Sequence, residues 1–169
     1  MPQQPALFYL KDTGIFPNST LPAVLYHQAL DLPYLFKGLF VKQLFAKNHW
    51  TNAWDSGIFT YHHYHSTSHE VLGFFKGGTT LLLGGENGQP ITVGPGDVLV
   101  IPAGVAHKNL GREHQVGCIG AYPDGRDFDI NTGKPGERLT TDQNIAQLPV
   151  PDNDPVYGAG KGIPLLWIR

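Results

Sequence analysis

The stretch GIFTYHHYHSTSHE, residues 57–70, contains four of the eight histidines of the chain, and a fifth, His107, follows a Pro-x-Gly turn further on. Neutral imidazoles combined with one carboxylate are the ligands that nitrogen- and oxygen-binding transition metals prefer. The stretch therefore predicts a metal site, and the rest of the chain is expected to be its scaffold.

The spacing of the histidines strengthens this interpretation. Side chains alternate between the two faces of a β-strand, so His63 and His65 are expected to project to one side and His62 to the other. After a short polar turn, residues 70–75 are typical of a second strand that returns Glu70 beside the histidine pair. A third strand, residues 98–101, ends in the turn that carries His107 back toward the same cavity.

These residues resemble the two signatures of the cupins, a family of small β-barrels. The first signature is Gly, five residues, His-x-His, four residues, Glu, six residues, Gly, and every spacing matches. The second is Gly, five residues, Pro-x-Gly, two residues, His, three residues, Asn; its last position holds Gly111, and Asn109 lies two residues early. The matching residues are Gly57, His63, His65, Glu70 and Gly77, then Gly96, Pro102, Gly104 and His107.

The resemblance implies a mainly β fold, a double-stranded β-helix (jelly-roll) barrel, with a metal held by His63, His65, Glu70 and His107. The whole chain is also similar to a group of single-domain bacterial cupins, through HHYHST, PAGVAHKNL and AYPDGRD. Barrels of this type commonly pair through sheet edges, so a homodimer is expected. A divalent transition metal is the expected cofactor, with Fe or Mn favoured and Zn, Ni or Cu as alternatives.

Composition excludes several classes of protein. The length, 169 residues, predicts one domain, and 21 Gly with 14 Pro favour many short strands and tight turns over a helical bundle. A net charge of −2 without a basic stripe argues against nucleic acid as a partner. No apolar run approaches the roughly twenty residues that span a membrane. With one cysteine and no leader segment, a cytoplasmic protein without an internal disulfide is expected.

The single domain is expected to have three parts: an N-terminal arm (1–50), a barrel with both signatures (51–123) and a C-terminal strap (124–169). In the arm, an amphipathic helix with Asp31 as N-cap and Pro33 in its first turn is predicted to pack on the barrel or on a second subunit. Its apolar face is Leu35, Phe36, Leu39, Phe40, Leu44 and Phe45. A hairpin is predicted to join residues 79–83 to 91–93, and residues 163–168 are expected to return as an edge strand or strap.

Strand parity also assigns the residues around the site. Tyr61 shares the face of His63 and His65, and it is the candidate for a catalytic or binding role because a buried phenol needs a partner. Phe59, on the same face, and Phe74, on the face of Glu70, are interpreted as ordinary barrel core.

The remaining polar and aromatic residues are interpreted structurally. His69 adjoins Glu70 in the turn and is assigned to the surface, with a supporting role beside the metal ligands as the alternative. Cys118 is expected to be inert filling. Trp50, Asn52 and Trp54 are assigned either to the cavity rim or to an aromatic edge belt packed on the helix, and the segment 122–127 is assigned to a loop held by an ion pair.

Rival histidine motifs fail on spacing. A zincin helix needs His-Glu, two residues and His, but Val71, Leu72 and Gly73 follow His69-Glu70. The metallo-hydrolase motif His-x-His-x-Asp-His needs Asp and His where Thr67 and Ser68 stand. The sequence also lacks a Gly-x-Ser-x-Gly elbow and a phosphate-binding loop.

The leading functional hypothesis is a metal-dependent dioxygenase-type oxidoreductase acting on a small anionic or enolisable substrate. Three imidazoles and one carboxylate leave a charge of about +1 on a divalent ion, which favours an anionic ligand oxygen. Two alternatives stay open: a non-catalytic small-ligand binding or sensing protein, and an isomerase or lyase that uses the metal as a Lewis acid. Oxygen consumption would separate the first hypothesis from the other two.

Overall fold

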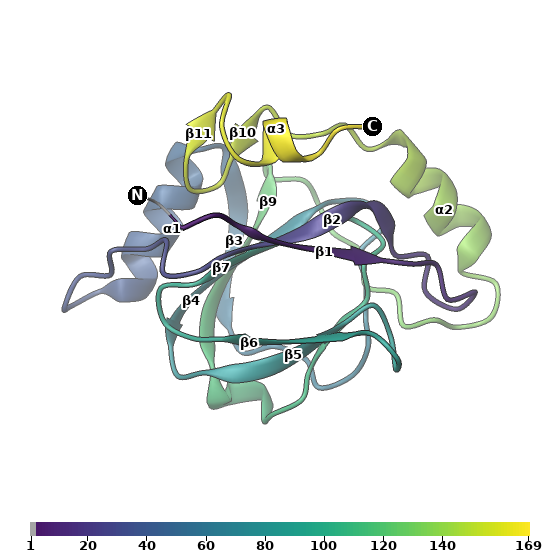
Figure 1. The fold of residues 1–169 in the computed structure, drawn as a ribbon, viewed down its shortest axis with the longest axis horizontal. Helices are drawn as coiled ribbons and strands as arrows, with labels where there is room; N and C mark the ends of the chain where they lie inside the picture. The colour runs from purple at the N-terminus through teal and green to yellow at the C-terminus, as the bar shows by residue number, and fades with distance from the viewer. Residues whose placement is uncertain (1–2) are drawn as a thin grey trace.

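Antiparallel β-strands form the framework of the computed structural model, which describes residues 3–169 (Figure 1). A six-stranded sheet has the strand order β1-β2-β7-β4-β9-β3, and a three-stranded sheet has the order β6-β5-β8. The mainly β, jelly-roll architecture expected from the sequence is confirmed.

The strands of the six-stranded sheet are, in spatial order, β1 (Ala6–Leu10), β2 (Ser19–Tyr26), β7 (Val98–Ile101), β4 (Glu70–Lys76), β9 (Gly117–Pro123) and β3 (Trp50–Ser56). Those of the three-stranded sheet are β6 (Gln89–Val93), β5 (Thr79–Leu83) and β8 (His107–Asn109). The predicted hairpin is the β5–β6 pair, which is longer than expected because β6 begins at Gln89.

An apolar layer fills the space between the two sheets. Leu72 and Phe74 of β4 and Leu99 of β7 pack there with Leu81 and Leu83 of β5. The intervening residues of β4 and β7 are buried on the opposite face of the six-stranded sheet. Both faces of these central strands are therefore covered, which explains their nearly continuous apolar sequences.

Helix α1 (Lys37–Lys47) covers the outer face of the six-stranded sheet through the fully buried side chains of Val41 and Phe45. The contact is close because it falls on a glycine of β4. A Cβ at Gly73 would lie 2.6 Å from Val41 Cγ1 and 2.7 Å from Phe45 Cζ. The prediction that the arm's helix packs on the outside of the barrel is confirmed.

The predicted start of this helix is wrong. The helix begins at Lys37 and not near Asp31 and Pro33, because Phe36 has a left-handed backbone conformation (φ 57°) that cannot continue into an α-helix. Leu35 and Phe36 consequently precede the helix and are exposed, and Leu39, within the helix, is exposed as well.

The C-terminal region wraps around the sheets as a strap. Helix α2 (Arg138–Gln147) is followed by the short pair β10 (Asn153–Asp154) and β11 (Gly158–Ala159), and then by helix α3 (Ile163–Leu166). The last segment is therefore helical and not an edge strand. It is anchored by Trp167, which is buried and whose Nε1 donates a hydrogen bond to the carbonyl of Pro22 (2.8 Å).

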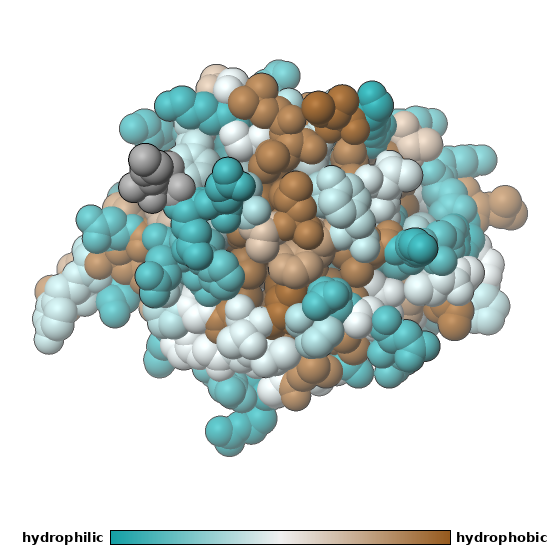
Figure 2. All heavy atoms as spheres, in the orientation of Figure 1, coloured by the Kyte–Doolittle hydropathy of each residue, from teal (hydrophilic) through white to brown (hydrophobic). Residues whose placement is uncertain are grey.

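On the face shown in Figure 2, apolar side chains gather over β1 and α3. Among the exposed apolar residues of these elements are Leu7 and Leu165. Within residues 3–169, the helices are too short or too polar for any of them to cross a membrane.

Candidate metal centre

Three separate parts of the chain bring the four predicted ligands together. His63 and His65 lie in the connection between β3 and β4, Glu70 is the first residue of β4, and His107 is the first residue of β8. The backbones of His63 and His107 are joined by two hydrogen bonds, from His63 N–H to His107 O (3.2 Å) and back (2.9 Å). All four side chains are buried.

Backbone carbonyls set the orientation of the three imidazole rings. Nδ1 of His63 lies 3.1 Å from the carbonyl of Tyr61, and Nδ1 of His107 lies 3.0 Å from that of Val105. Nδ1 of His65 makes a short contact with the carbonyl of Asp129. Because a carbonyl only accepts hydrogen bonds, each Nδ1 carries the proton and each Nε2 keeps its lone pair.

These rings face one another and Glu70. One ring nitrogen from each of His63, His65 and His107 lies within 4.8 Å of the other two. Oε2 of Glu70 is 3.3 Å from Nε2 of His65 and 3.2 Å from Nε2 of His107.

Two atoms of this cluster are left without a hydrogen bond. Nε2 of His65 and Oε2 of Glu70 are buried, and neither has a hydrogen-bond partner of acceptable geometry among the described residues. A buried polar atom without a partner is costly, and a cation between the two would satisfy both. The arrangement of donor atoms therefore fits a divalent metal ion.

The protonation equilibria also favour a cation at this point. Burial acts to raise the pKa of Glu70, but His65 and His107 hold that pKa well below its ordinary value. Burial, together with His107, lowers the pKa of His63 to about 3, so this ring is neutral near pH 7. Burial opposes protonation of His65, but Glu70 nevertheless raises its pKa. The carboxylate thus attracts positive charge.

Tyr122, on β9 beside β4, fixes the orientation of Glu70. Its hydroxyl donates a hydrogen bond to Oε1 of Glu70 (3.0 Å) and accepts one from Nε1 of Trp54 (2.7 Å). Oε1 is thereby occupied and Oε2 is left to face the histidines. Trp54 in turn lies against Gly120, where a Cβ would come within 2.1 Å of its ring.

A cavity of about 210 Å³ adjoins the cluster. Most of its walls are apolar, and they come from both sheets and from the strap. Besides the four candidate ligands, the lining residues are Trp54, Ser56, Gly57, Ile58, Phe59, Leu72, Tyr122, Phe128 and Ile130. Trp54 is therefore a wall of the cavity. Trp50 is instead buried on the outer face with Val41 and Phe45 of α1, as the edge-belt alternative expected.

Phe128 and Ile130 reach the cavity because Asp129, between them, is tied to the segment that carries the histidines. Its carboxylate accepts hydrogen bonds from the backbone N–H groups of Ser66 (2.6 Å) and Thr67 (3.2 Å), and from the hydroxyl of Ser66. Partial burial acts to raise the pKa of Asp129, but these hydrogen bonds keep it below its ordinary value. The carboxylate and the carbonyl of one residue thus position both a cavity wall and His65.

Sequence reasoning missed Tyr122, Phe128, Asp129 and Ile130. The ion pair expected to fix the loop 122–127 is not observed among residues 3–169. Tyr122, at the start of this segment, donates a hydrogen bond to Glu70. The alternation of apolar and polar residues from Phe128 to Asn131, within a polar stretch, was the available signal for a strand-like segment at the cavity.

The structure does not bring Tyr61 into the cavity. Its side chain is 46% exposed and stacks on Phe59, with ring centroids 4.9 Å apart. The prediction that Tyr61 shares the cavity face of His63 and His65 was wrong because residues 57–65 form only isolated bridges and no regular strand. Phe59, interpreted as core, is in fact a wall of the cavity. Phe74 and Cys118 lie in the core between the sheets, as predicted.

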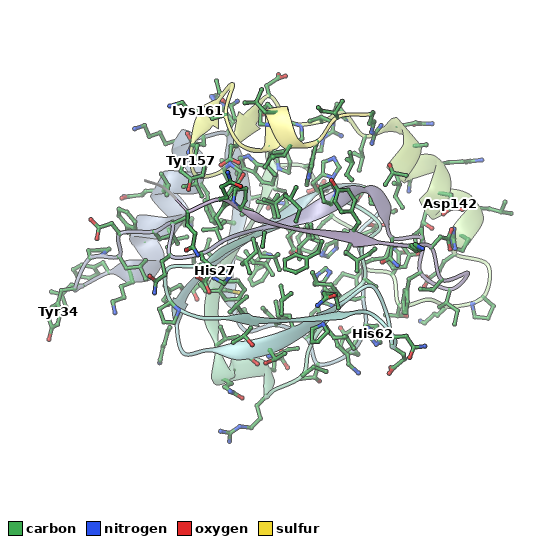
Figure 3. All side chains as sticks on the ribbon, in the orientation of Figure 1. His27, Tyr34, His62, Asp142, Tyr157 and Lys161 are labelled. Carbon is green, nitrogen blue, oxygen red and sulfur yellow. The ribbon has the colours of Figure 1, made fainter. Side chains whose placement is uncertain are left out.

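The two other histidines of the stretch face away from the cluster. His69 is not on the surface: it is buried, accepts a hydrogen bond from Ala103 N–H at Nδ1 (2.9 Å), and lies 3.1 Å from the carbonyl of Pro149 through Nε2. Burial lowers its pKa to about 4. His62 points outward near the β5–β6 hairpin, as predicted, and contacts Glu86 (3.1 Å; Figure 3).

Comparison with known proteins gives one full-length relative and several partial structural likenesses. YjlB, an uncharacterized protein of Bacillus subtilis, is 36% identical over 170 residues, which cover 100% of both chains. No protein-family model matches the sequence.

Among solved structures, acireductone dioxygenase from Bacillus anthracis, with a cadmium ion in its active centre, has a TM-score of 0.38 and 19% identity. The match covers 50% of this chain and 57% of that one. Oxalate decarboxylase from Bacillus subtilis at pH 4.6 has a TM-score of 0.37 and 13% identity, and the match covers 100% of this chain and 46% of that one. The matched residues therefore span about half the length of each of these two enzymes.

Proposed function

We propose that this chain, which belongs to the family of the Bacillus subtilis protein YjlB and carries the two cupin signatures in its sequence, is a metal-dependent cupin that acts on a small anionic ligand. The proposed metal ligands are His63, His65, Glu70 and His107. One observation carries the proposal: the Nδ1 groups of the three rings are occupied by carbonyls, and Nε2 of His65 and of His107 lie 3.3 and 3.2 Å from an oxygen of Glu70 that has no hydrogen-bond partner among residues 3–169.

A divalent metal bound there would supply Lewis acidity and, in the case of iron or manganese, one-electron chemistry. The residues of the chain have three further tasks. Tyr122 holds Glu70 in one orientation, the carbonyls of residues 61, 105 and 129 hold the rings, and the walls formed by Trp54 and Phe128 limit access of water. Low access of water strengthens the attraction between the centre and an anion.

Dioxygenase-type oxidoreductase chemistry is the leading form of this proposal. Beyond the four proposed ligands, the cavity lining offers two hydroxyl groups and no free carboxylate, amine or imidazole. One of these hydroxyls, that of Tyr122, is already engaged on both sides. An isomerase or lyase needs a group that moves protons, so this lining favours chemistry centred on the metal.

The same lining favours a second candidate, a non-catalytic protein that binds or senses a small ligand through the metal. An apolar cavity without a general acid or base is sufficient for binding. The homodimer and the cytoplasmic location expected from the sequence stay predictions. In such a dimer, one of the two edge strands of the six-stranded sheet, β1 or β3, would pair.

The ligand assignment is tested by elemental analysis of untagged protein prepared without chelators. We expect near-stoichiometric iron or manganese in the wild type, and loss of the metal in Glu70→Ala and His107→Ala. His27→Ala is the matched control, because His27 is a partly exposed histidine on another part of the surface (Figure 3). Full metal occupancy in folded Glu70→Ala and His107→Ala proteins would refute the assignment.

The two candidate functions are separated with an oxygen electrode. Iron-loaded protein is mixed with a panel of small enols and catechols, with electron paramagnetic resonance spectra recorded anaerobically before oxygen is added. Oxygen uptake that depends on Glu70 supports the dioxygenase. Metal-dependent perturbation of the spectrum without uptake supports the binding protein.

A further inference from the structure

The cavity beside the proposed metal centre has no positive charge of its own. None of its lining residues is Lys or Arg. Lys108, the neighbour of His107 in β8, faces away and lies 3.7 Å from Glu86. Arg138 on α2 is held by Asp12 and Asp142.

The mouth of the cavity is apolar. Phe128 and Ile130 line it, and their side chains are 36% and 47% exposed. Exposed apolar residues at the rim of a pocket are typical of a site for an apolar group. The polar exception is Ser56, which is neutral.

The candidate metal ligands and the apolar walls of the cavity therefore favour different parts of a ligand. A divalent metal with three imidazoles and one carboxylate keeps a net charge of about +1, which one anionic group neutralises. Inside the cavity and away from the metal, a second anionic group would lose water and meet apolar walls, among them Trp54, without a cation to pair with.

We propose that the cavity is specific for small monoanions: one anionic head group next to the metal, and an apolar, flat body against Trp54 and Phe128. Molecules of the same shape that carry a second charge on this apolar body are rejected. This inference rests on the proposed metal function and names the class of ligand for that site. The volume of about 210 Å³ limits the ligand to the size of a small aromatic or branched aliphatic acid or enol.

Two probes of nearly identical shape test the inference. 4-Methylbenzoate carries one carboxylate and an apolar methyl group, whereas terephthalate carries a second carboxylate at the position of that methyl group. The two carboxylates of terephthalate are too far apart to reach one metal ion together. Binding to zinc-loaded protein is measured by isothermal titration calorimetry, after zinc occupancy has been determined, and by the fluorescence of Trp54, with Trp54→Phe as reference.

We expect 4-methylbenzoate to bind at least about tenfold more tightly than terephthalate, because an unpaired buried charge costs at least that factor. In an Ile130→Lys variant, terephthalate is expected to gain at least about tenfold in affinity, since a cation then stands at the rim. Leu110→Lys is the matched control: Leu110 is 49% exposed and does not line the cavity. It should leave both affinities unchanged.

The outcomes separate the two levels of the proposal. A protein that takes up no metal refutes the proposed function itself. A zinc-loaded protein that binds terephthalate as tightly as 4-methylbenzoate, or that binds neither, refutes the monoanion specificity alone. A gain for terephthalate in both lysine variants would show that overall charge, and not the cavity, controls affinity.

Discussion

The phenol of Tyr122 is the contact that fixes Glu70, so its removal is expected to weaken the metal site. In Tyr122→Phe, Oε1 of Glu70 loses its donor and Nε1 of Trp54 loses its acceptor. Loss of a contact that orients a metal ligand typically lowers metal affinity by about 10- to 100-fold. The prediction is checked by competition between the protein and a chromogenic chelator for zinc.

A matched control distinguishes this effect from general destabilisation. Tyr26 is another buried phenol that donates to a carboxylate, Oδ2 of Asp154 (2.6 Å), away from the metal centre. Both variants are expected to lose about 1–3 kcal/mol of unfolding free energy, because each leaves a buried group without a partner. Equal zinc affinity in Tyr122→Phe, Tyr26→Phe and wild-type protein would contradict the role of Tyr122.

The sequence predicted which candidate ligands lie together, but not which residues position them. The ligands follow local spacing rules, since each lies at the end of a strand or beside a turn. Tyr122 meets Glu70 through the pairing of β4 with β9, where Val71 lies opposite Ala121, and that register depends on the whole sheet. His69 was misassigned for the same reason: it is covered by Pro149 and Trp167, about 80 and 100 residues later, which no local pattern reveals.

The segment 127–131 acts as one element because Asp129 fastens it to the histidine segment. In Asp129→Ala, the N–H groups of Ser66 and Thr67 lose their acceptor. We expect a loss of about 1–3 kcal/mol in unfolding free energy, because these buried groups are left without a partner. Zinc affinity should also fall, because the carbonyl of Asp129 holds the ring of His65 through Nδ1. Urea denaturation and chelator competition measure the two effects.

Asp127→Ala is the comparison for this prediction. Asp127 lies two residues earlier. Its backbone carbonyl accepts a hydrogen bond from Thr67, but its carboxylate makes no hydrogen bond or ion pair among the described residues. This variant should keep the unfolding free energy and the zinc affinity of the wild type. A folded Asp129→Ala protein with unchanged zinc affinity would show that the segment does not position His65.

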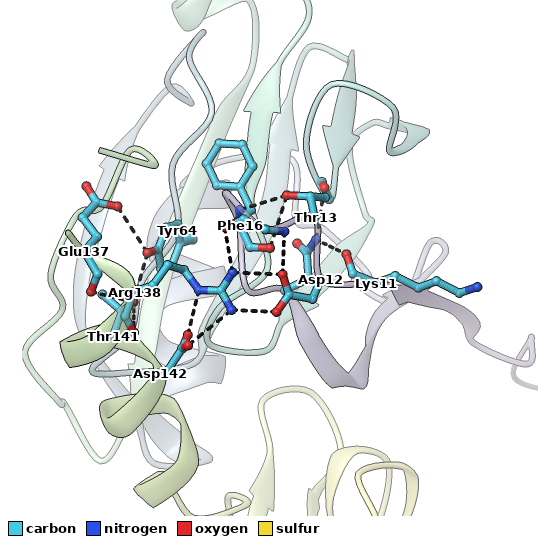
Figure 4. Close-up of polar contacts among 12 residues, drawn as sticks. Lys11, Asp12, Thr13, Phe16, Tyr64, Glu137, Arg138, Thr141 and Asp142 are labelled. Atoms are coloured by element: carbon cyan, nitrogen blue, oxygen red, sulfur yellow. Dashed lines mark hydrogen bonds and ion pairs between the residues drawn. The ribbon is translucent and has the colours of Figure 1, made fainter. Parts of the chain in front are cut away.

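Helix α2 is held to the N-terminal arm by one arginine (Figure 4). Arg138 contacts Asp12 (2.6 Å), Asp142 (2.9 Å) and the carbonyl of Gly14 (3.1 Å). These contacts are largely exposed, so Arg138→Ala is expected to cost about 1 kcal/mol or less of unfolding free energy, and less still at high salt. Urea denaturation at low and high salt measures this.

The pH dependence of this contact follows from Asp12. Hydrogen bonds from Arg138 and the backbone of Gly14 lower the pKa of the Asp12 carboxyl. A lowered pKa in the folded state means that the contribution is present above the unfolded pKa of about 4 and is lost as the pH falls below it. Lys42→Ala, which removes an exposed cation of α1 that has no ion pair among the described residues, should show neither the salt nor the pH effect.

Removing the metal is expected to destabilise the whole molecule, because the proposed centre joins the two sheets. Glu70 belongs to β4 of the six-stranded sheet, and His107 belongs to β8 of the three-stranded sheet. A metal that binds only the folded chain stabilises it by about 4 kcal/mol at a free concentration 1,000 times its Kd. For a domain of this size, each kcal/mol raises Tm by about 2–4 °C, so zinc should raise Tm by about 10 °C.

Thermal unfolding in excess zinc and in excess chelator measures this difference. In Glu70→Gln the carboxylate charge is lost while the size of the side chain is kept. The difference in Tm between excess zinc and excess chelator should therefore shrink to a few degrees. A wild-type Tm that is the same with zinc and with chelator would mean that no metal bridges β4 and β8. If instead Glu70→Gln kept the full difference, zinc would be binding elsewhere on the chain, and the four proposed ligands would be wrong.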